Sequence, residues 1–253
     1  MADKNTTAAA APRRMSKRLQ SNLITYAVVI GFFALMTVLE VTGILTNSLA
    51  GQLVPICAYV CMAVSLNLVV GISGELSLGH AGFMSVGAFS GFVAFSLVNG
   101  IVNNALLAYV LALVIAAVIA GVAGFVIGIP VMRLRGDYLA IVTLAFGEII
   151  KNILNNLYVG LDGSGLHFSL SDAKALGMQG GTLLINGPQG ATGITKMSTF
   201  AIGIVLVLIT VTVVLNLVNS RTGRAIMSVR DNRIAAESVG INVTKYRMIA
   251  FVV

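Results

Sequence analysis

Six apolar stretches of about 20 residues each dominate this sequence. They run approximately over residues 23–45, 49–70, 80–98, 105–129, 138–157 and 199–218, and a seventh begins at 246. A helix needs roughly 20 mostly apolar residues to cross the hydrocarbon core of a bilayer. Only 10% of the 253 residues are charged, whereas soluble domains carry about 25%. These features exclude a soluble enzyme and predict a polytopic membrane protein.

The spans are predicted to be helices, so the fold class is all-α. Lipid offers no hydrogen-bond partner to the backbone, and the sequence lacks the ten-residue alternation of a barrel. The small-residue spacings that begin at Gly87 and Gly124 fit close packing between helices. Cys57 and Cys61 lie four residues apart in an apolar run. We interpret them as small core residues rather than as a metal site or a disulfide.

The distribution of Lys and Arg predicts the orientation. If the N-terminus is inside, thirteen of the 16 basic residues lie in segments that face the cytoplasm, namely 1–18, 131–137 and 219–247. The three basic residues that fall outside are Lys151, Lys174 and Lys196. Because basic loops face the cytoplasm, a cytoplasmic N-terminus is predicted. The net charge of +7 then reflects membrane orientation rather than a nucleic-acid partner.

The chain is expected to divide into a tail and a membrane domain. Residues 1–18 are polar and basic, which indicates a disordered cytoplasmic tail, and 19–253 form the transmembrane domain. The segment 158–197 is too polar to enter lipid and is long enough to be functional or disordered. It is expected outside the cell, over the outer mouth or as a receptor for a soluble partner. Since the seventh stretch stops after eight residues, the C-terminal spans are expected to be missing.

Glu148 is the most costly polar residue in the predicted spans. It lies ten residues beyond Tyr138, or about 15 Å along a helix, near the middle of the bilayer. A carboxylate there costs about 2.5–3.5 kcal/mol. Lys151, one helical turn further on, can supply a partner. A polar lining for a substrate path and a structural ion pair both stay open as interpretations.

The segment 71–83 joins the second and third spans and contains four glycines. Such a stretch resists forming one straight helix, and non-helical backbone near a membrane is tolerated where it is buried or lines a cavity. It is predicted either to shape a path or to be an ordinary inner loop. Candidate path residues here and in the fifth span are Glu75, Ser77, Gly79, His80, Tyr138, Thr143 and Glu148.

The inner segment 219–247 contains a predicted short helix. Asp231 suits an N-cap and Gly240 the position after a C-cap, so residues 232–239 are expected to form two turns. Ala235 and Ala236 would allow a partner to approach closely. Docking to another protein and an ordinary basic loop both stay open.

Three stretches together resemble the LivM-type permease subunits of branched-chain amino-acid ABC importers. They are residues 67–83, which include Gly-Ile-Ser-Gly-Glu-Leu-Ser-Leu-Gly-His-Ala-Gly-Phe; residues 133–150, Arg-Leu-Arg-Gly-Asp-Tyr-Leu-Ala-Ile-Val-Thr-Leu-Ala-Phe-Gly-Glu-Ile-Ile; and residues 223–251. In the third, Ile234-Ala235-Ala236-xxx-Gly240 resembles the Glu-Ala-Ala-xxx-Gly loop of importer permeases, with Ile in place of Glu. The likeness covers about 50–253. It includes 187–194 and leaves 158–186 as an insertion.

The resemblance implies a helical-bundle permease of the bacterial plasma membrane, truncated after about six full spans. It would move branched-chain amino acids by ATP-driven alternating access. Its partners would be a LivH-type second permease, two cytosolic ATPases and an extracytoplasmic solute-binding protein. ATPase coupling would fall to Arg224, Asp231, Ile234, Ala235, Ala236 and Gly240. Since the sequence has no Gly-x-x-x-x-Gly-Lys-Ser/Thr loop, ATP and Mg would bind the partners, and this chain would hold no cofactor or metal.

Alternative functions stay open beside this one. A permease of the same family could carry urea, short amides or other amino acids. An ion-coupled secondary transporter could use the region of Glu148. An intramembrane enzyme would need Glu75, His80, Asp137 or Glu148, but the sequence offers no nucleophile–base spacing and no His-Glu-x-x-His pair.

Overall fold

The computed structural model describes residues 17–44, 46–102, 104–134, 136–163, 165–178, 180–193 and 198–253. Most of the predicted tail lies outside these residues, but the first helix already begins at Lys17. The chain divides into two compact units, Met1–Leu53 and Val54–Val253. The boundary falls within the second helix.

The first unit contains α1 (Lys17–Val41) and the first turns of α2 (Asn47–Asn67). Within α1, the residues Gln20–Val41 are long and apolar enough to cross a membrane. Its threonines bond inside the helix: Thr25 and Thr37 donate their hydroxyls to the carbonyl oxygens four residues earlier, at 3.1 and 2.9 Å. Such bonds satisfy a hydroxyl without a partner from another element.

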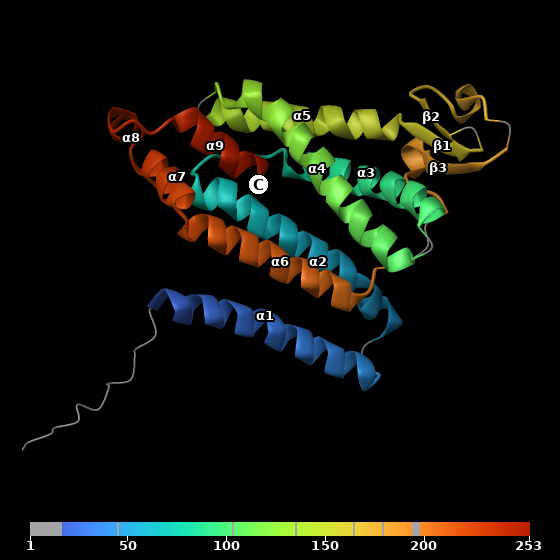
Figure 1. Cartoon of the computed structure of the whole chain (residues 1–253), viewed down its shortest axis with the longest axis horizontal. Helices are drawn as coiled ribbons and strands as arrows, with labels where there is room; N and C mark the ends of the chain where they lie inside the picture. Colours follow the sequence, from blue (N-terminus) through green and yellow to red (C-terminus); the bar gives the residue numbers. More distant parts are fainter. Residues whose placement is uncertain are drawn as a thin grey trace, which may run out of the picture. The chain divides into compact units, whose positions relative to one another are not determined.

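The second unit contains the remaining elements. They are η1 (Leu68–Ile72), α3 (His80–Ile101), α4 (Ala105–Val131), α5 (Asp137–Asn155), β1 (Tyr158–Asp162), β2 (Gly165–Ser169), η2 (Ala173–Leu176), β3 (Thr182–Asn186), η3 (Gly187–Gln189), α6 (Phe200–Asn219), α7 (Arg221–Asp231), α8 (Arg233–Ser238) and α9 (Val243–Val252). The strands lie at one end of helices α3 to α6, and α7 and α8 lie at the other end (Figure 1).

The described helices confirm an all-α membrane protein. Five of them are long and apolar enough to be spans: Gln20–Val41, Asn47–Ile72, His80–Ile101, Ala105–Val131 and Phe200–Asn219. The sixth predicted span corresponds to α5, which has 19 residues but carries Asp137, Glu148 and Lys151. Because α5 is not among these five candidate spans, its position in a membrane stays a prediction.

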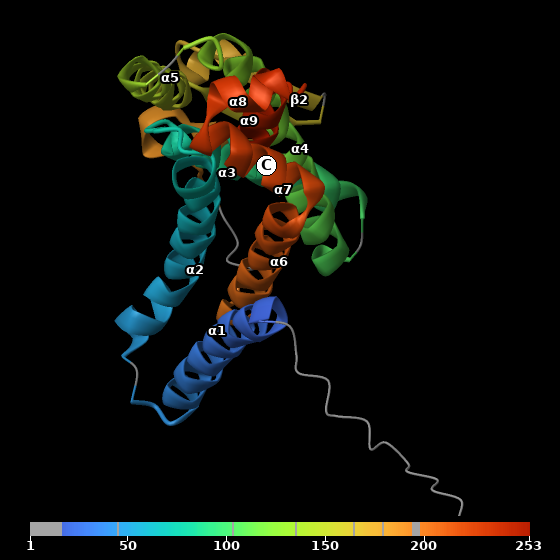
Figure 2. The same ribbon diagram turned by 90° about the vertical axis from the view of Figure 1, so that its left-hand side faces the viewer.

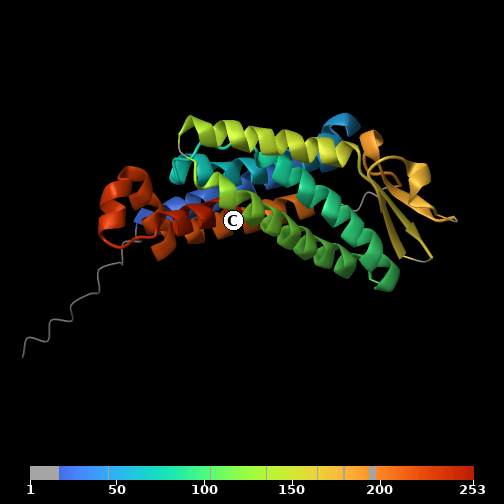
Figure 3. The same cartoon turned by 90° about the horizontal axis from the view of Figure 1, so that it is seen from above.

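Small residues bring the helices of the second unit close together, as their spacing predicts. A Cβ atom at Gly91 of α3 would lie 3.1 Å from the Cβ of Ala116 on α4. A Cβ atom at Gly128 of α4 would lie 3.3 Å from the ring of Phe251 on α9. Helices α3 and α4 therefore pack at close range, and α4 also packs against α9 (Figure 3).

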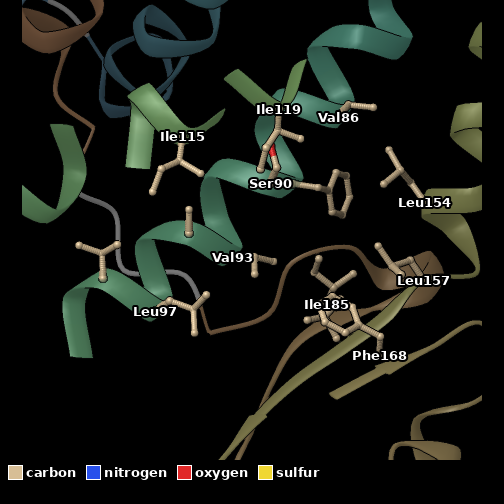
Figure 4. A pocket seen from close by; sticks show the side chains of 14 residues that line it. Val86, Ser90, Val93, Leu97, Ile115, Ile119, Leu154, Leu157, Phe168 and Ile185 are labelled. Atoms are coloured by element: carbon tan, nitrogen blue, oxygen red, sulfur yellow. The ribbon is translucent and has the colours of Figure 1, made fainter. Parts of the chain in front are cut away.

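A three-stranded antiparallel sheet in the order β2-β1-β3 follows α5, and the sequence analysis did not predict it. Val159 of β1 faces Phe168 on one neighbour and Ile185 on the other. The buried Val159, Leu184 and Ile185 pack against Phe89, Phe92 and Val93 of α3. An apolar hollow of about 400 Å³ remains beside this contact, between the sheet, α3 and α4 (Figure 4).

A second core lies at the opposite end of the unit. Its buried residues are Val69, Val131, Met132, Leu139 and Phe251. They come from η1, the end of α4, the start of α5 and α9, so four separate segments meet there. This core holds the non-helical segment between η1 and α3 in place.

Candidate functional site

The chain is not helical over residues 73–79, between η1 and α3. The Ser73 N–H donates to the Leu68 carbonyl oxygen at 3.0 Å, five residues back, so α2 ends in a widened π turn. Gly74 then adopts a φ of +74°, which favours glycine. The glycines therefore interrupt the helix as predicted. Such π turns occur often at functional sites.

Gly79 lets this segment touch α5 directly. A Cβ atom at Gly79 would overlap the carbonyl oxygen of Thr143. The Leu78 N–H donates to the Thr143 Oγ1 at 3.1 Å, and that hydroxyl donates to the Ala140 carbonyl oxygen at 2.9 Å. The structure thus brings together two predicted path residues, Gly79 and Thr143.

Two further predicted residues have unused hydrogen-bonding atoms. Ser77 is 2% exposed, and its Oγ has no hydrogen-bond partner among the described residues. The Nδ1 atom of His80 is likewise buried without a described partner, and its ring packs edge-on against Phe83. A buried polar atom without a partner costs about 1–3 kcal/mol. Such atoms often mark places where water or a ligand binds.

His80 lines a cavity of about 480 Å³ that is bounded by α2, α3, α4, α6 and α9. The other polar groups in its wall include Ser65 and Thr210, whose hydroxyls donate to backbone carbonyl oxygens of their own helices. The rest of the wall is largely apolar, with Met62 and Met84 among the lining residues. Pockets of about 300–1,000 Å³ suit small ligands.

The two cysteines of α2 lie near this cavity and are free thiols. Cys57 is buried against α6, where a Cβ atom at Gly203 would lie 3.0 Å from the Cβ of Cys57. Cys61 is half-buried and lines the cavity. Cys57 is therefore a small core residue as predicted, whereas Cys61 lies at the cavity wall.

Glu75 pairs with Arg247, a partner that the sequence analysis missed because it lies 172 residues away. Arg247 is 5% exposed and Glu75 is 18% exposed. The same guanidinium donates to the carbonyl oxygens of Met132 and Leu134, each at 3.4 Å. One side chain thus joins α9, the end of α4 and the segment 73–79. A charge within the predicted seventh span was the signal that could have found this pair.

A second arginine ties α7 to the same region. Arg230 donates from its Nη1 to the Gly71 carbonyl oxygen at 3.0 Å. A Cβ atom at Gly74 would lie 2.7 Å from the Cγ of Arg230. We call α7, α8 and α9 with their connections, residues 221–252, the hairpin (Figure 2). It contacts the segment 71–75 at both Arg230 and Arg247.

The short helix predicted at 232–239 is α8, but its N-cap is Asn232 and not Asp231. The Asn232 side chain accepts from the Ala235 N–H at 3.0 Å. Asp231 instead ends α7 and accepts hydrogen bonds from Arg230. Gly240 follows the helix with a φ of +86°, as predicted for that position.

The two alanines of α8 differ in exposure. Ala235 is exposed beside Ile234, which is 81% exposed. Ala236 is only 4% exposed and belongs to a cluster with Val229 and Val243 inside the hairpin. Of the predicted coupling residues, Ile234 and Ala235 therefore form a surface, whereas Ala236 shapes the hairpin core. Arg224 donates to the Asn219 carbonyl oxygen at 3.3 Å, near the end of α6.

Tyr138 and Glu148 of α5 lie apart from the cavity. Tyr138 is largely exposed. Glu148 pairs with Lys151 at 3.0 Å, and both side chains are more than half exposed. The predicted ion pair is present, and the path role of Glu148 stays a prediction. Among the residues that the structure describes, no group of His, Cys, Asp or Glu side chains is placed to hold a metal ion.

Comparisons with known proteins agree with this architecture. A family model described as the permease component of a branched-chain amino acid transport system matches residues 48–253. The chain is similar to the high-affinity branched-chain amino acid transport system permease proteins LivM of Salmonella typhimurium and Escherichia coli. It is 33% identical to each over 205 residues, which cover 77% of this chain and 47% of the relative. The chain thus spans about half the length of these relatives. No solved structure gives a significant match.

Proposed function

The chain belongs to the family of permease components of branched-chain amino acid transport systems, and we propose that it is the membrane subunit of an ATP-driven importer. A soluble binding protein delivers the amino acid outside, and a LivH-type second permease completes the path. Two cytosolic ATPases bind ATP and Mg and drive alternating access. The membrane is the bacterial inner membrane, and the N-terminus is cytoplasmic.

The arrangement of the two ends supports this orientation. Three segments that are predicted to face the cytoplasm meet through the hydrogen bonds of Arg230 and Arg247. They are residues 71–79, 131–137 and 219–247. The sheet, which is predicted to face outside, lies at the opposite end (Figure 1). A topology with one basic end inside accounts for both observations.

The contacts of the hairpin with the segment 71–75 are the observation that carries the proposal. Ile234 and Ala235 form a small exposed surface suited to a groove on an ATPase. Arg230 and Arg247 connect the hairpin that bears this surface to the non-helical segment that leads to His80 and the cavity. Movement of the hairpin would therefore reach the cavity wall through defined hydrogen bonds.

The wall of the cavity favours a substrate with an aliphatic side chain. Its lining is mostly apolar, and the hydroxyls of Ser65 and Thr210 are already bonded to their own helices. A branched aliphatic side chain would bury apolar surface there. Branched-chain amino acids are therefore the proposed cargo.

The docking role is tested by changing Ala235 to Arg. The larger charged side chain should abolish copurification of the ATPase while membrane insertion stays normal. The matched control is Ala175→Arg, an exposed alanine at the sheet end of the unit. Normal recovery of the ATPase with Ala235→Arg would contradict the docking role. Ala236 is unsuited to this test because its change would disrupt the hairpin core.

The cargo and the energy source are tested by uptake measurements in cells. Labelled leucine should enter, labelled urea should not, and deletion of the ATPases should stop the uptake. Uptake that persists without the ATPases and follows an ion gradient would instead indicate a secondary transporter.

A further inference from the structure

A small polar pocket lies between the hairpin and the segment 73–75. Its volume is about 230 Å³, and its lining includes Ser73, Glu75, Gly136, Arg230, Arg233 and Arg247. We call it the arginine pocket. Three arginines and one glutamate line it, so its lining residues carry more positive than negative charge.

The carboxylates that partner Arg230 and Arg233 do not line the pocket. Arg230 pairs with Asp231 at 3.1 Å and Arg233 pairs with Glu237 at 3.0 Å. Both carboxylate side chains are at least half exposed. Ion pairs of this exposed kind contribute little and exchange readily with other partners. Both arginines therefore remain able to bind an anion in the pocket.

Arg247 at the pocket wall has an unused donor. The side chain is 5% exposed, and its Nε–H has no hydrogen-bond acceptor among the described residues. Its two Nη atoms are occupied by Glu75, Met132 and Leu134. The Nε–H group is covered by surrounding atoms. An acceptor there would satisfy a buried donor that is otherwise costly.

We propose that the arginine pocket binds a phosphate group. The planar fork of an arginine matches the oxygens of a phosphate, and three arginines line a pocket large enough for a small tetrahedral anion. The pocket lies at the end of the unit that is proposed to face the cytoplasm. Basic pockets between membrane helices on that side bind phospholipid headgroups.

The position favours a phospholipid as the source of the phosphate. The pocket adjoins Gly136, next to the start of α5, and Tyr138 is exposed two residues further on. Tyrosines are enriched where membrane helices meet the headgroup layer. A soluble phosphate offers the same chemistry, so the experiment must separate the two sources. The site rests on the proposed orientation but not on the docking of an ATPase.

The test compares two double variants that remove the same charge from the same side of the protein. Arg230→Gln with Arg233→Gln alters the pocket, whereas Arg221→Gln with Lys245→Gln alters exposed residues outside it. Each protein is placed in phosphatidylcholine nanodiscs with increasing phosphatidylglycerol, and bound phosphatidylglycerol is counted by native mass spectrometry. The pocket variant should bind it roughly tenfold more weakly, the effect of losing about one charged hydrogen bond, and the control should match the unaltered protein.

A second variant guards against misfolding, because Arg230 also holds the Gly71 carbonyl oxygen. Arg233→Gln alone removes one pocket guanidinium without touching that bond, and a reduction of a few-fold is expected. The melting temperature of each variant confirms that it is folded. The proposal would be overturned if the pocket and control variants bound phosphatidylglycerol equally and also bound inorganic phosphate equally.

The second arm adds inorganic phosphate. If phosphate alone binds the unaltered protein and fails to bind the pocket variant, the phosphate site stands with a soluble source. If phosphatidylglycerol stays bound in excess phosphate, the source is the lipid. If the pocket variant loses only its copurifying ATPase and keeps both ligands, the arginines serve a protein partner and the proposal is wrong.

Discussion

The sheet at one end of the second unit is held by apolar packing, whereas the hairpin at the other end is held by arginines. Val159, Leu184 and Ile185 of the sheet pack on aromatic and aliphatic side chains of α3. Arg230 and Arg247 of the hairpin bond to backbone carbonyl oxygens and to Glu75. The sheet forms from one continuous stretch of chain, while the arginine contacts join residues more than 100 positions apart.

This difference indicates what each end can do. Apolar packing is driven by burial of surface and is non-directional. A guanidinium that bonds to several carbonyl oxygens defines one arrangement and is lost when the partners separate. The hairpin end is therefore suited to transmitting a discrete movement, and the sheet end to covering the helices. Four substitutions test this comparison.

The largest effect is expected from Arg247→Met, which leaves Glu75 without its partner. Breaking a buried ion pair from one side costs about 3–5 kcal/mol because the remaining charge is uncompensated. The melting temperature in detergent should fall strongly. The double variant Glu75→Gln with Arg247→Met removes both charges and should recover part of the loss. If the double variant is no more stable than Arg247→Met, the ion pair does not hold this end.

Ile185→Ala should be the next largest change, because this side chain is 1% exposed at the centre of the sheet's contact with α3. Truncating a buried isoleucine costs about 2–5 kcal/mol. The loss should be local, with faster hydrogen exchange in 158–186 and none in the hairpin. The exposed Leu170→Ala on the same segment is the control. Faster exchange in the hairpin as well would show that the two ends are not independent.

The sequence predicted the helices well because their signal is local. Apolar length identified the spans, and the glycine spacings identified the contacts of Gly91 and Gly128. The glycines of 71–79 also predicted the interruption before α3. The sheet was missed because 158–186 is polar and rich in glycine, so its short strands have no clear alternation. Its core depends on α3, which lies more than 60 residues earlier.

The candidate site was predicted only in part. His80 lines the cavity, and the adjacent Gly79 contacts Thr143. Ser77, Tyr138 and Glu148 are not among the lining residues. Glu75 is held by its ion pair with Arg247, and no local sequence pattern reveals a partner 172 residues away. Likewise, the burial of Ala236 beside the exposed Ala235 depends on Val229 and Val243, which complete the hairpin core.

Gly79→Ala tests the contact between the non-helical segment and α5. The new Cβ atom would overlap the backbone carbonyl oxygen of Thr143, which cannot move aside alone. Overpacking of this kind costs about 1–3 kcal/mol, so a moderate fall in melting temperature is expected. Gly100→Ala on α3 is the control, since its Cβ would meet nothing within 4 Å, and it should be neutral or slightly stabilising. Equal effects of the two substitutions would contradict the close contact at Gly79.

The smallest effect is expected from Glu148→Leu, because this carboxylate belongs to neither end. Its described partner is Lys151 on the same helix, and exposed pairs contribute about 0–1 kcal/mol. We expect an unchanged melting temperature and normal leucine uptake, since Glu148 does not line the described cavity wall. Lys151→Met is the matched control, which removes the other half of the pair. Loss of uptake in Glu148→Leu alone, with the melting temperature unchanged, would place Glu148 on the path. The transmission of movement could then no longer be assigned to the arginines of the hairpin end alone.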